Sequence, residues 1–326
     1  MAVVTYRDAL TQALREELQR DDRVFLMGEE VAQYNGAYKV SKGLLDEFGP
    51  MRIVDTPITE LGFAGVGVGA AMVGLRPIVE FMTWNFALLA IDEVVNAAAK
   101  MRYMSGGQFK IPMVFRGPNG GALQLGAQHS QAWESWLAHI PGLKVCTPAT
   151  PADAKGLLKS AIRDDNPVVF LESEMLYNTK GDVPEGEHIV PLGVAELKRK
   201  GDHCSVITHG KMALVAMKVA DDLAKEGINI DVVDLRTVRP IDIEAIARSV
   251  QKTNRAVVLE EGWEICGMGS QVVDFIQREC FDDLDAPVLR VHQEDVPMPY
   301  AKNLERAAKP DAGKTVAAIK KVMYLD

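Results

Sequence analysis

Short apolar segments alternate with amphipathic helical segments along almost the whole chain, and this alternation restricts the fold more than any other feature. In the first half the apolar segments are RVFLMGEEV, RIVD, RPIVEF, IPMVFRG, LKVCTP and PVVFLE. The segments between them, such as 7–20, 86–104 and 151–163, repeat apolar residues at helical spacing. In 86–104 this spacing puts Leu88, Ile91, Val95, Ala98 and Met101 on one face of a predicted helix. Strands separated by helices in this way pair in parallel and are covered by helices on both faces. The sequence therefore predicts an α/β fold with a parallel sheet.

The alternation lapses once, where NTKGDVPEGEHIVPLG carries glycine, proline and charges without a period. Such a composition is typical of a linker. The alternation then resumes at CSVITHG, INIDVVDLRT, RAVVLEE and APVLRVH, with helical segments between them. A chain of 326 residues is long enough for two domains. We predict one α/β domain at 1–178, a linker at 179–198 and a second α/β domain at 199–326.

Charge and composition argue against several classes of function. The net charge is -9 and no cluster of lysine and arginine stands out, so we expect no nucleic-acid partner. No run of about 18 apolar residues is present, and the N-terminal residues lack the pattern of a signal peptide, so we expect no membrane association. The cysteines are far apart without CxxC spacing, which is typical of thiols in a reducing compartment. These features predict an intracellular protein.

Gly65, Gly67 and Ala70 satisfy the G-x-G-x-x-G/A pattern of dinucleotide-binding proteins. In those proteins the glycines form the turn after a strand, and a full helix follows them. Here Gly74 follows too soon for a full helix. We therefore expect the glycines to lie inside a helix at about 60–73, where they allow close packing. A nicotinamide-dependent oxidoreductase is the alternative from a different class.

Glu60 opens that predicted helix among glycine, alanine and valine, directly after Thr59, which can cap it. An acid at a helix N-terminus is stabilised by the helix dipole and needs no further role. A carboxyl group in apolar surroundings also has a raised pKa, which suits proton exchange near neutral pH. Position alone does not decide between these readings. The neighbouring residues make Glu60 a solitary acid among apolar side chains.

Several long motifs resemble the β subunit of pyruvate dehydrogenase, within the thiamine-diphosphate-dependent 2-oxoacid dehydrogenase family. They are DTPITELGFAGVGVGAAMVGLRPIVEFMTWNFALLAID, AAAKMRYMSGG, VFRGPNGG, AQHSQ and VPMPYAKNLE, and they cover nearly the whole chain in the family's order. The resemblance implies an N-terminal domain that binds the pyrimidine ring of thiamine diphosphate. It also implies a C-terminal transketolase-like α/β domain.

The resemblance gives Glu60 a chemical role. In the family the matching glutamate hydrogen-bonds the aminopyrimidine ring nitrogen of thiamine diphosphate and thereby favours the tautomer that accepts the thiazolium proton. The cofactor then acts as the electron sink while carbon dioxide leaves. Phe86 matches the aromatic residue that packs on the pyrimidine, and Met82 falls near the same wall. Leu89 stands where mitochondrial relatives carry glutamine, so a polar contact is not expected there.

His129, in AQHSQ, matches a histidine that lines the mouth of the family's active site. The resemblance implies that it donates a proton while the acyl group passes to a lipoyl arm, a task that suits a near-neutral pKa. A structural histidine after a glycine-rich loop is the alternative. The resemblance matches no catalytic role to the other histidines.

The resemblance also implies partners and ions. The family's α chain carries the Gly-Asp-Gly motif and holds magnesium, and this chain lacks that motif, so we expect an assembly of two α and two β chains. Potassium in some relatives corresponds to Asp164 and Asn166 with the carbonyls of Met113 and Ala161, although an ordinary helix C-terminus explains them equally well. Asp285 and the terminal Asp326 correspond to contacts with the dihydrolipoyl acetyltransferase core; a solvated acidic loop is the alternative.

The sequence therefore predicts the β chain of an enzyme for the oxidative decarboxylation of pyruvate, the step that follows glycolysis and yields acetyl-CoA. Two alternatives with the same chemistry are a branched-chain 2-oxoacid dehydrogenase and an acetoin dehydrogenase. A non-catalytic scaffold subunit is a third class. We expect a bacterial cytoplasm or an organelle stroma as the compartment.

Overall fold

The chain folds into two compact units. A computed structural model describes residues 1–325. The first unit comprises Met1–Asn119 and Trp136–Leu192, and the second comprises Gly120–Ser135 and the chain from Gly193 onward. The short segment 120–135 thus belongs to the second unit although its neighbours on both sides belong to the first.

The first unit is built on a parallel sheet, as predicted. Its strands run in the order β6-β7-β5-β4-β2-β3, and every one of these neighbouring pairs is parallel. In the register of the sheet Leu26 lies opposite both Ile53 and Ile78. The strands are β2 (Val24–Gly28), β3 (Ile53–Asp55), β4 (Arg76–Glu80), β5 (Val114–Pro118), β6 (Lys144–Cys146) and β7 (Val168–Glu172).

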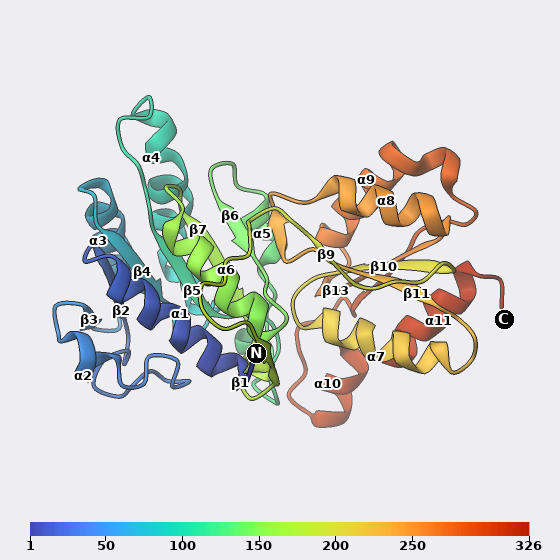
Figure 1. Cartoon of the computed structure of the whole chain (residues 1–326), viewed down its shortest axis with the longest axis horizontal. Helices are drawn as coiled ribbons and strands as arrows, with labels where there is room; N and C mark the ends of the chain where they lie inside the picture. Colours follow the sequence, from blue (N-terminus) through green and yellow to red (C-terminus); the bar gives the residue numbers. More distant parts are fainter. Residues whose placement is uncertain (326) are drawn as a thin grey trace. The chain divides into compact units, whose positions relative to one another are not determined.

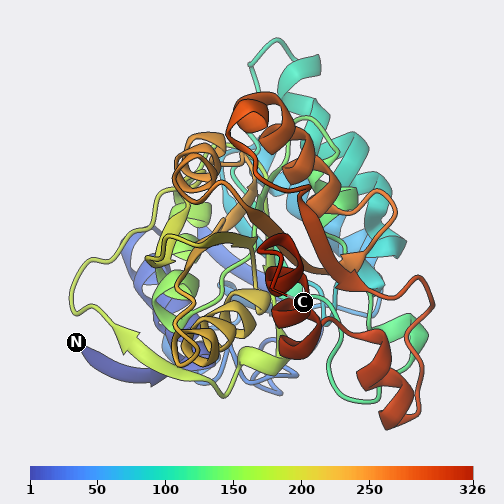
Figure 2. The ribbon, with the colours of Figure 1, turned by 90° about the vertical axis from the view of Figure 1, so that its right-hand side faces the viewer.

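Helices cover both faces of this sheet (Figures 1 and 2). The helices α1 (Tyr6–Arg20) and α6 (Pro151–Arg163) pack together on one face, and α3 (Glu60–Met72) packs against β4 on the other. Thr5 and Thr150 cap α1 and α6 with their hydroxyl groups. Smaller elements are β1 (Ala2–Thr5), which pairs antiparallel with β8 (Lys180–Val183), α2 (Leu44–Phe48), α5 (Glu134–Ala138) and η4 (Glu174–Leu176).

The segment 86–104 differs from the single regular helix expected for it. It consists of a 3₁₀ turn, η1 (Phe86–Ala90), a π-helical stretch, η2 (Glu93–Ala98), and the α-helix α4 (Ala99–Met104). The expected apolar face began at Leu88, which is exposed, and the buried positions include Ala87, Ala90 and Val94 instead. The predicted face is therefore wrong, because the changes in helical pitch rotate it. Ala98 is buried, as predicted.

The second unit has its own sheet, in the order β14-β13-β10-β11-β9. The inner pairs are parallel, whereas the edge strand β9 pairs antiparallel with β11. The apolar pattern did not predict β9, because it is a short and mostly polar edge strand. The strands of this unit are β9 (Glu196–Arg199), β10 (Cys204–Thr208), β11 (Ile230–Asp234), β12 (Thr237–Arg239), β13 (Ala256–Trp263) and β14 (Leu289–Gln293).

Helices also cover both faces of the second sheet (Figure 1). The helices α7 (Met212–Ala224) and α11 (Ala312–Val322) enclose one apolar core, and α8 (Ile243–Thr253) and α9 (Met268–Cys280) enclose the other. The remaining elements are η3 (Ala127–His129), η5 (Phe281–Asp283) and α10 (Lys302–Ala308). Over residues 1–325, no helix is both long and apolar enough to cross a membrane.

Candidate active site

A pair of buried glutamates lies at the carboxyl edge of the first sheet. Glu29 directly follows β2, and Glu60 begins α3, which the chain enters after the neighbouring strand β3. The carboxyl ends of parallel strands share one edge, so these two residues meet although they are far apart in sequence. Glu29 and Glu60 are 7% and 4% exposed, and their side chains are hydrogen-bonded to each other. The expectation that Glu60 is a solitary acid is therefore wrong.

The pairing places a proton in the site at neutral pH. Burial, together with the negative charge and the hydrogen bond of Glu60, raises the pKa of Glu29 to about 7. The Oε1 atom of Glu29 is buried and has no hydrogen-bond partner within residues 1–325. The pair therefore resembles two acids that share one proton, with one polar atom left available.

Thr59 does not cap α3 as expected. Its side chain makes no capping hydrogen bond, and its hydroxyl group lies 3.4 Å from the carbonyl oxygen of Pro57. The first N–H groups of α3 therefore have no side-chain acceptor from Thr59.

Aromatic and apolar side chains lie on or next to the elements that contact α3. Phe86 begins η1, which packs against α3, and Met82 follows β4; both are half-buried. Phe81 continues the apolar floor, with its ring 5.8 Å from that of Phe63 and stacked at 5.9 Å on that of Phe115. The structure thus brings the predicted Phe86 onto an element that contacts the Glu60 helix. Leu89 is 64% exposed.

A buried ionic cluster lies at the same sheet edge and was not predicted. Arg116 in the middle of β5 makes two hydrogen bonds of 2.6 Å to Glu172 on β7, and it also pairs with Glu80 on β4. Burial raises the pKa of Glu80, against the lowering effect of Arg116. The hydroxyl of Tyr177 donates to Glu172 at 2.8 Å. A sequence signal was present, because Glu80 and Glu172 are the last residues of β4 and β7, each directly after apolar residues, and Arg116 interrupts the apolar β5.

The glycine pattern at 65–70 does not form a dinucleotide-binding turn. Both glycines lie inside α3, as predicted. A Cβ atom on Gly67 would lie 2.7 Å from Cγ2 of the buried Val79, and one on Gly65 would lie 3.2 Å from Cδ of Glu93. Gly67 therefore allows the helix to approach β4 closely.

His129 lies in the second unit and is half-buried at the end of η3. It is part of a loop that closes on itself, because the N–H of Gly120 donates to the carbonyl oxygen of Gln131 at 2.9 Å. The two predicted catalytic residues, Glu60 and His129, thus belong to different units.

The residues predicted to hold potassium bind donors of the protein instead. The carboxylate of Asp164 accepts hydrogen bonds from the ammonium of Lys144 and from the main-chain N–H of Asn166. The carbonyl of Met113 accepts from Val168, and that of Ala161 accepts from Asp164. In the described part of the chain, no group of three or more His, Cys, Asp or Glu side chains could hold a metal ion. Lys144 thus already balances the charge of Asp164, and the potassium site stays a prediction.

The predicted contacts with an acyltransferase core lie near the C-terminus. Asp285 is half-exposed and pairs with Arg255 at 2.9 Å, so it already has an internal partner. Asp326 lies outside the described residues.

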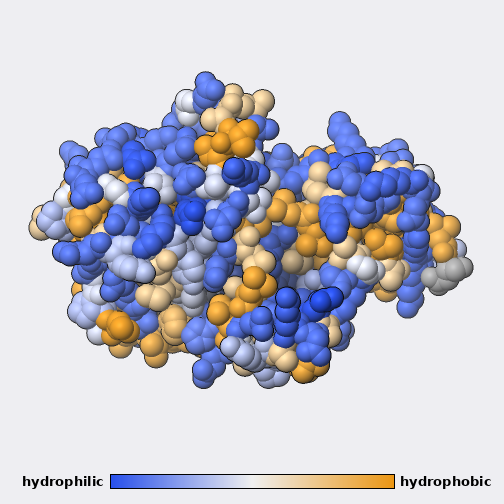
Figure 3. Space-filling model, turned by 90° about the horizontal axis from the view of Figure 1, so that it is seen from below, coloured by the Kyte–Doolittle hydropathy of each residue, from blue (hydrophilic) through white to orange (hydrophobic). Residues whose placement is uncertain are grey.

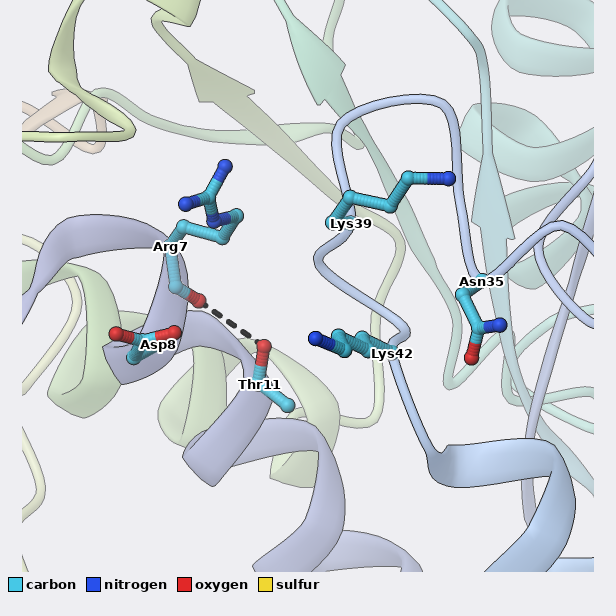
Figure 4. A pocket seen from close by; sticks show the side chains of 6 residues that line it. All are labelled: Arg7, Asp8, Thr11, Asn35, Lys39 and Lys42. Atoms are coloured by element: carbon cyan, nitrogen blue, oxygen red, sulfur yellow. Dashed lines mark hydrogen bonds between the residues drawn. The ribbon is translucent and has the colours of Figure 1, made fainter.

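A separate cavity of about 430 Å³ lies in the first unit between the start of α1 and the segment after β2. Figure 4 shows the ammonium of Lys42 pointing toward Thr11, whose hydroxyl donates to the carbonyl of Arg7. Lys39 lies over the ring of Tyr34, 3.4 Å from its centre. The lining is charged and polar and includes none of the predicted site residues. It consists of Arg7, Asp8, Thr11, Asn35, Lys39 and Lys42.

Comparison with known proteins places both units in described families. Residues 2–180 match the family model of the transketolase pyrimidine binding domain, and residues 193–314 match that of the transketolase C-terminal domain. The chain is similar over its whole length to a solved structure described as a split gene transketolase, an inactive β4 tetramer. The TM-score is 0.82 at 24% identity, and the match covers 99% of each chain. This likeness supports the two-domain α/β fold.

Curated relatives are more similar in sequence. The chain is 53% identical over 325 residues to the pyruvate dehydrogenase E1 component subunit beta of Rhizobium meliloti (strain 1021), covering 99% of this chain and 71% of that protein. It is 53% identical to the protein of the same name from Rickettsia felis, with 98% of each chain covered. A mitochondrial protein of that name from Dictyostelium discoideum is 54% identical, with 98% of this chain and 91% of that protein covered.

Proposed function

The chain belongs to the family of pyruvate dehydrogenase E1 component β subunits, and we propose that it supplies the pyrimidine side of a thiamine diphosphate site. The reaction is the oxidative decarboxylation of pyruvate with reductive acetylation of a lipoyl group. The observation that carries this proposal is the buried Glu29–Glu60 pair at the start of α3, within a unit of the pyrimidine-binding family. A carboxyl pair that holds a proton near pH 7 is suited to proton exchange with a ring nitrogen.

The residues present fit the cofactor. The unpartnered Oε1 atom of Glu29 and the proton of the pair offer hydrogen bonding to a nitrogen heterocycle in a largely apolar setting. Phe86 offers an aromatic face on the element packed against α3. Among the residues predicted to bind potassium, by contrast, the ammonium of Lys144 already pairs with Asp164. The proposed mechanism therefore gives potassium no role.

The mechanism assigns proton handling to the glutamate pair. When bound, thiamine diphosphate supplies the electron sink for loss of carbon dioxide. Glu60 would hold a proton at its carboxyl oxygen and exchange it with a ring nitrogen of the bound pyrimidine. Glu29, whose pKa is raised to about 7, would hold a proton beside Glu60. Phe86 orients the ring and, with Phe63 and Phe81, limits the access of water. His129 then moves a proton at one of its ring nitrogens during acyl transfer to the lipoyl group.

The site requires partners. We propose an α subunit that contributes the diphosphate and magnesium half of the site, in an assembly of two α and two β chains. A dihydrolipoyl acetyltransferase core, with its lipoyl domain, then receives the acetyl group. Apolar side chains reach the surface on the helix that Glu60 begins, where Leu61 and Val66 are 52% and 62% exposed. Hydrophobic residues are also exposed on the face that Figure 3 displays. Exposed apolar patches of this kind are typical of subunit contacts.

The test is the activity of the chain co-expressed with its α partner. We expect thiamine-diphosphate-dependent decarboxylation of pyruvate by the purified complex and none by the chain alone. Glu60→Gln should lower kcat by roughly 100-fold or more, as expected for loss of an essential proton-transfer group, while the complex still assembles. Glu30→Gln, a change at an exposed acid next to the pair, is the control and should keep full activity. An active Glu60→Gln complex would instead favour a scaffold role.

A further inference from the structure

The loop that carries His129 is held at its start by an ion pair of the second unit. The Oε1 atom of Glu261, on β13, accepts a hydrogen bond from the N–H of Gly121 at 2.6 Å. It also lies 2.5 Å from the ammonium of Lys211, which precedes α7. That ammonium donates in turn to the carbonyl oxygen of Gly121 at 2.6 Å. The charged pair therefore binds both main-chain groups of one loop residue.

A second ion pair binds the next residues of the loop. Lys309, directly after α10, donates to the carbonyl of Ala122 at 2.6 Å and pairs with Glu305 at 2.6 Å. The Oε1 atom of Glu305 also accepts from the N–H of Gln124 at 3.2 Å. Main-chain groups of Gly121, Ala122 and Gln124 are thus all bound by charged side chains.

The glycines of the loop fit this arrangement. Gly120 has a φ of +78°, and a Cβ atom there would lie 2.3 Å from Oε2 of Glu261. A Cβ atom on Gly121 would lie 3.2 Å from Cε of Lys309. A side chain at Gly120 would therefore push Glu261 away from the backbone it binds.

The two leucines in the middle of the loop do not anchor it. Leu123 and Leu125 are 64% and 41% exposed, so burial of their side chains contributes little. The side chains of Glu261 and Lys211 are only 8% and 12% exposed, and loss of either partner leaves a largely buried charge unpaired. The loop closes at Gln131, two residues after His129.

We propose that Glu261–Lys211 and Glu305–Lys309 are positioning residues that hold the 120–131 loop and, through it, His129. This inference rests on the proposed function, because the role of His129 in acyl transfer belongs to it. It assigns these four charged residues a part in the reaction, through the position of His129, without direct contact with the reacting atoms.

Hydrogen exchange of the 120–131 amides is the first test, and it does not depend on activity. In Lys211→Met these amides should exchange at least tenfold faster than in the wild-type chain, both alone and in the complex with the α subunit. Lys211→Arg, which keeps the charge and a donor, should restore most of the protection. Lys225→Met removes an exposed lysine of the same unit that pairs with Asp222 and should change nothing in the loop. Unchanged exchange in Lys211→Met would overturn the proposal.

Two partial reactions of the assembled enzyme form the second test. Acetylation of the lipoyl domain by Lys211→Met should be about tenfold slower in kcat, while decarboxylation coupled to an artificial electron acceptor should change less than twofold. A loop that exchanges faster without slower acetylation would refute the link to His129. If the wild-type complex does not decarboxylate pyruvate, the proposed function fails while the exchange result still tests the ion pairs. If Lys211→Met does not fold, Glu261→Gln, which keeps an acceptor but loses the charge, replaces it with the same expectations.

Discussion

At the scale of single residues, the pair formed by Glu29 and Glu60 makes stability depend on pH. The pKa of Glu29 is about 7 in the folded chain, against an ordinary value near 4.5. Between these values the folded state binds more protons than the unfolded state, so this group lowers the free energy of unfolding as pH rises from about 4.5 to 7. Below about pH 4.5 the carboxyl group is protonated in both states, so it no longer lowers the free energy of unfolding.

Glu29→Gln should remove this dependence, because the amide cannot ionise. Relative to the wild-type chain, the variant should gain stability as pH rises through the window, by up to roughly 3 kcal/mol above pH 7. Urea unfolding at pH 5 and pH 8, without cofactor, measures the difference. Glu30→Gln should show the same difference from wild type at both values. A Glu29→Gln variant that is equally stable relative to wild type at pH 5 and pH 8 would contradict the shared proton.

At the scale of elements, two glycines of α3 should respond in opposite ways to replacement by alanine. A Cβ atom at Gly67 meets the buried Val79 at 2.7 Å, whereas one at Gly69 meets nothing within 4 Å. Gly67→Ala should therefore lower the free energy of unfolding by roughly 1 to 3 kcal/mol through overpacking. Gly69→Ala should raise it by about 0.5 to 1 kcal/mol, because alanine is the better helix former. Denaturant unfolding of the isolated chain compares the two, and changes of equal sign would refute the packing argument.

At the scale of the whole molecule, the remaining choice concerns the substrate. Pyruvate, branched-chain 2-oxoacids and acetoin fit the same cofactor chemistry, and they differ in the volume and polarity that the assembled site must accept. We expect kcat/KM of the complex for pyruvate to exceed that for branched 2-oxoacids by at least about tenfold, a ratio that one or two methylene groups can produce. A higher kcat/KM for the branched acids or for acetoin would instead assign the chain to a branched-chain 2-oxoacid dehydrogenase or an acetoin dehydrogenase.

The sequence by itself determined the types and the order of most elements. The apolar strands from Val24 to Val291 and the helices at 7–20 and 151–163 were predicted near their observed positions, because each depends on periodicity within a few neighbouring residues. The resemblance of its motifs also identified the family. The pattern did not predict polar edge strands such as β9, nor the changes of helix type within 86–104. In both cases strand pairing and packing override the local sequence pattern.

Only the tertiary structure decided how the site is completed. Glu29 meets Glu60 because β2 and β3 are parallel neighbours, and Arg116 joins Glu80 and Glu172 because β5 lies between β4 and β7 in the sheet. The loop of His129 belongs to the second unit because Glu261 and Lys309 bind its backbone from more than 100 residues away. Such contacts follow from strand order and chain path, which no local window of sequence contains.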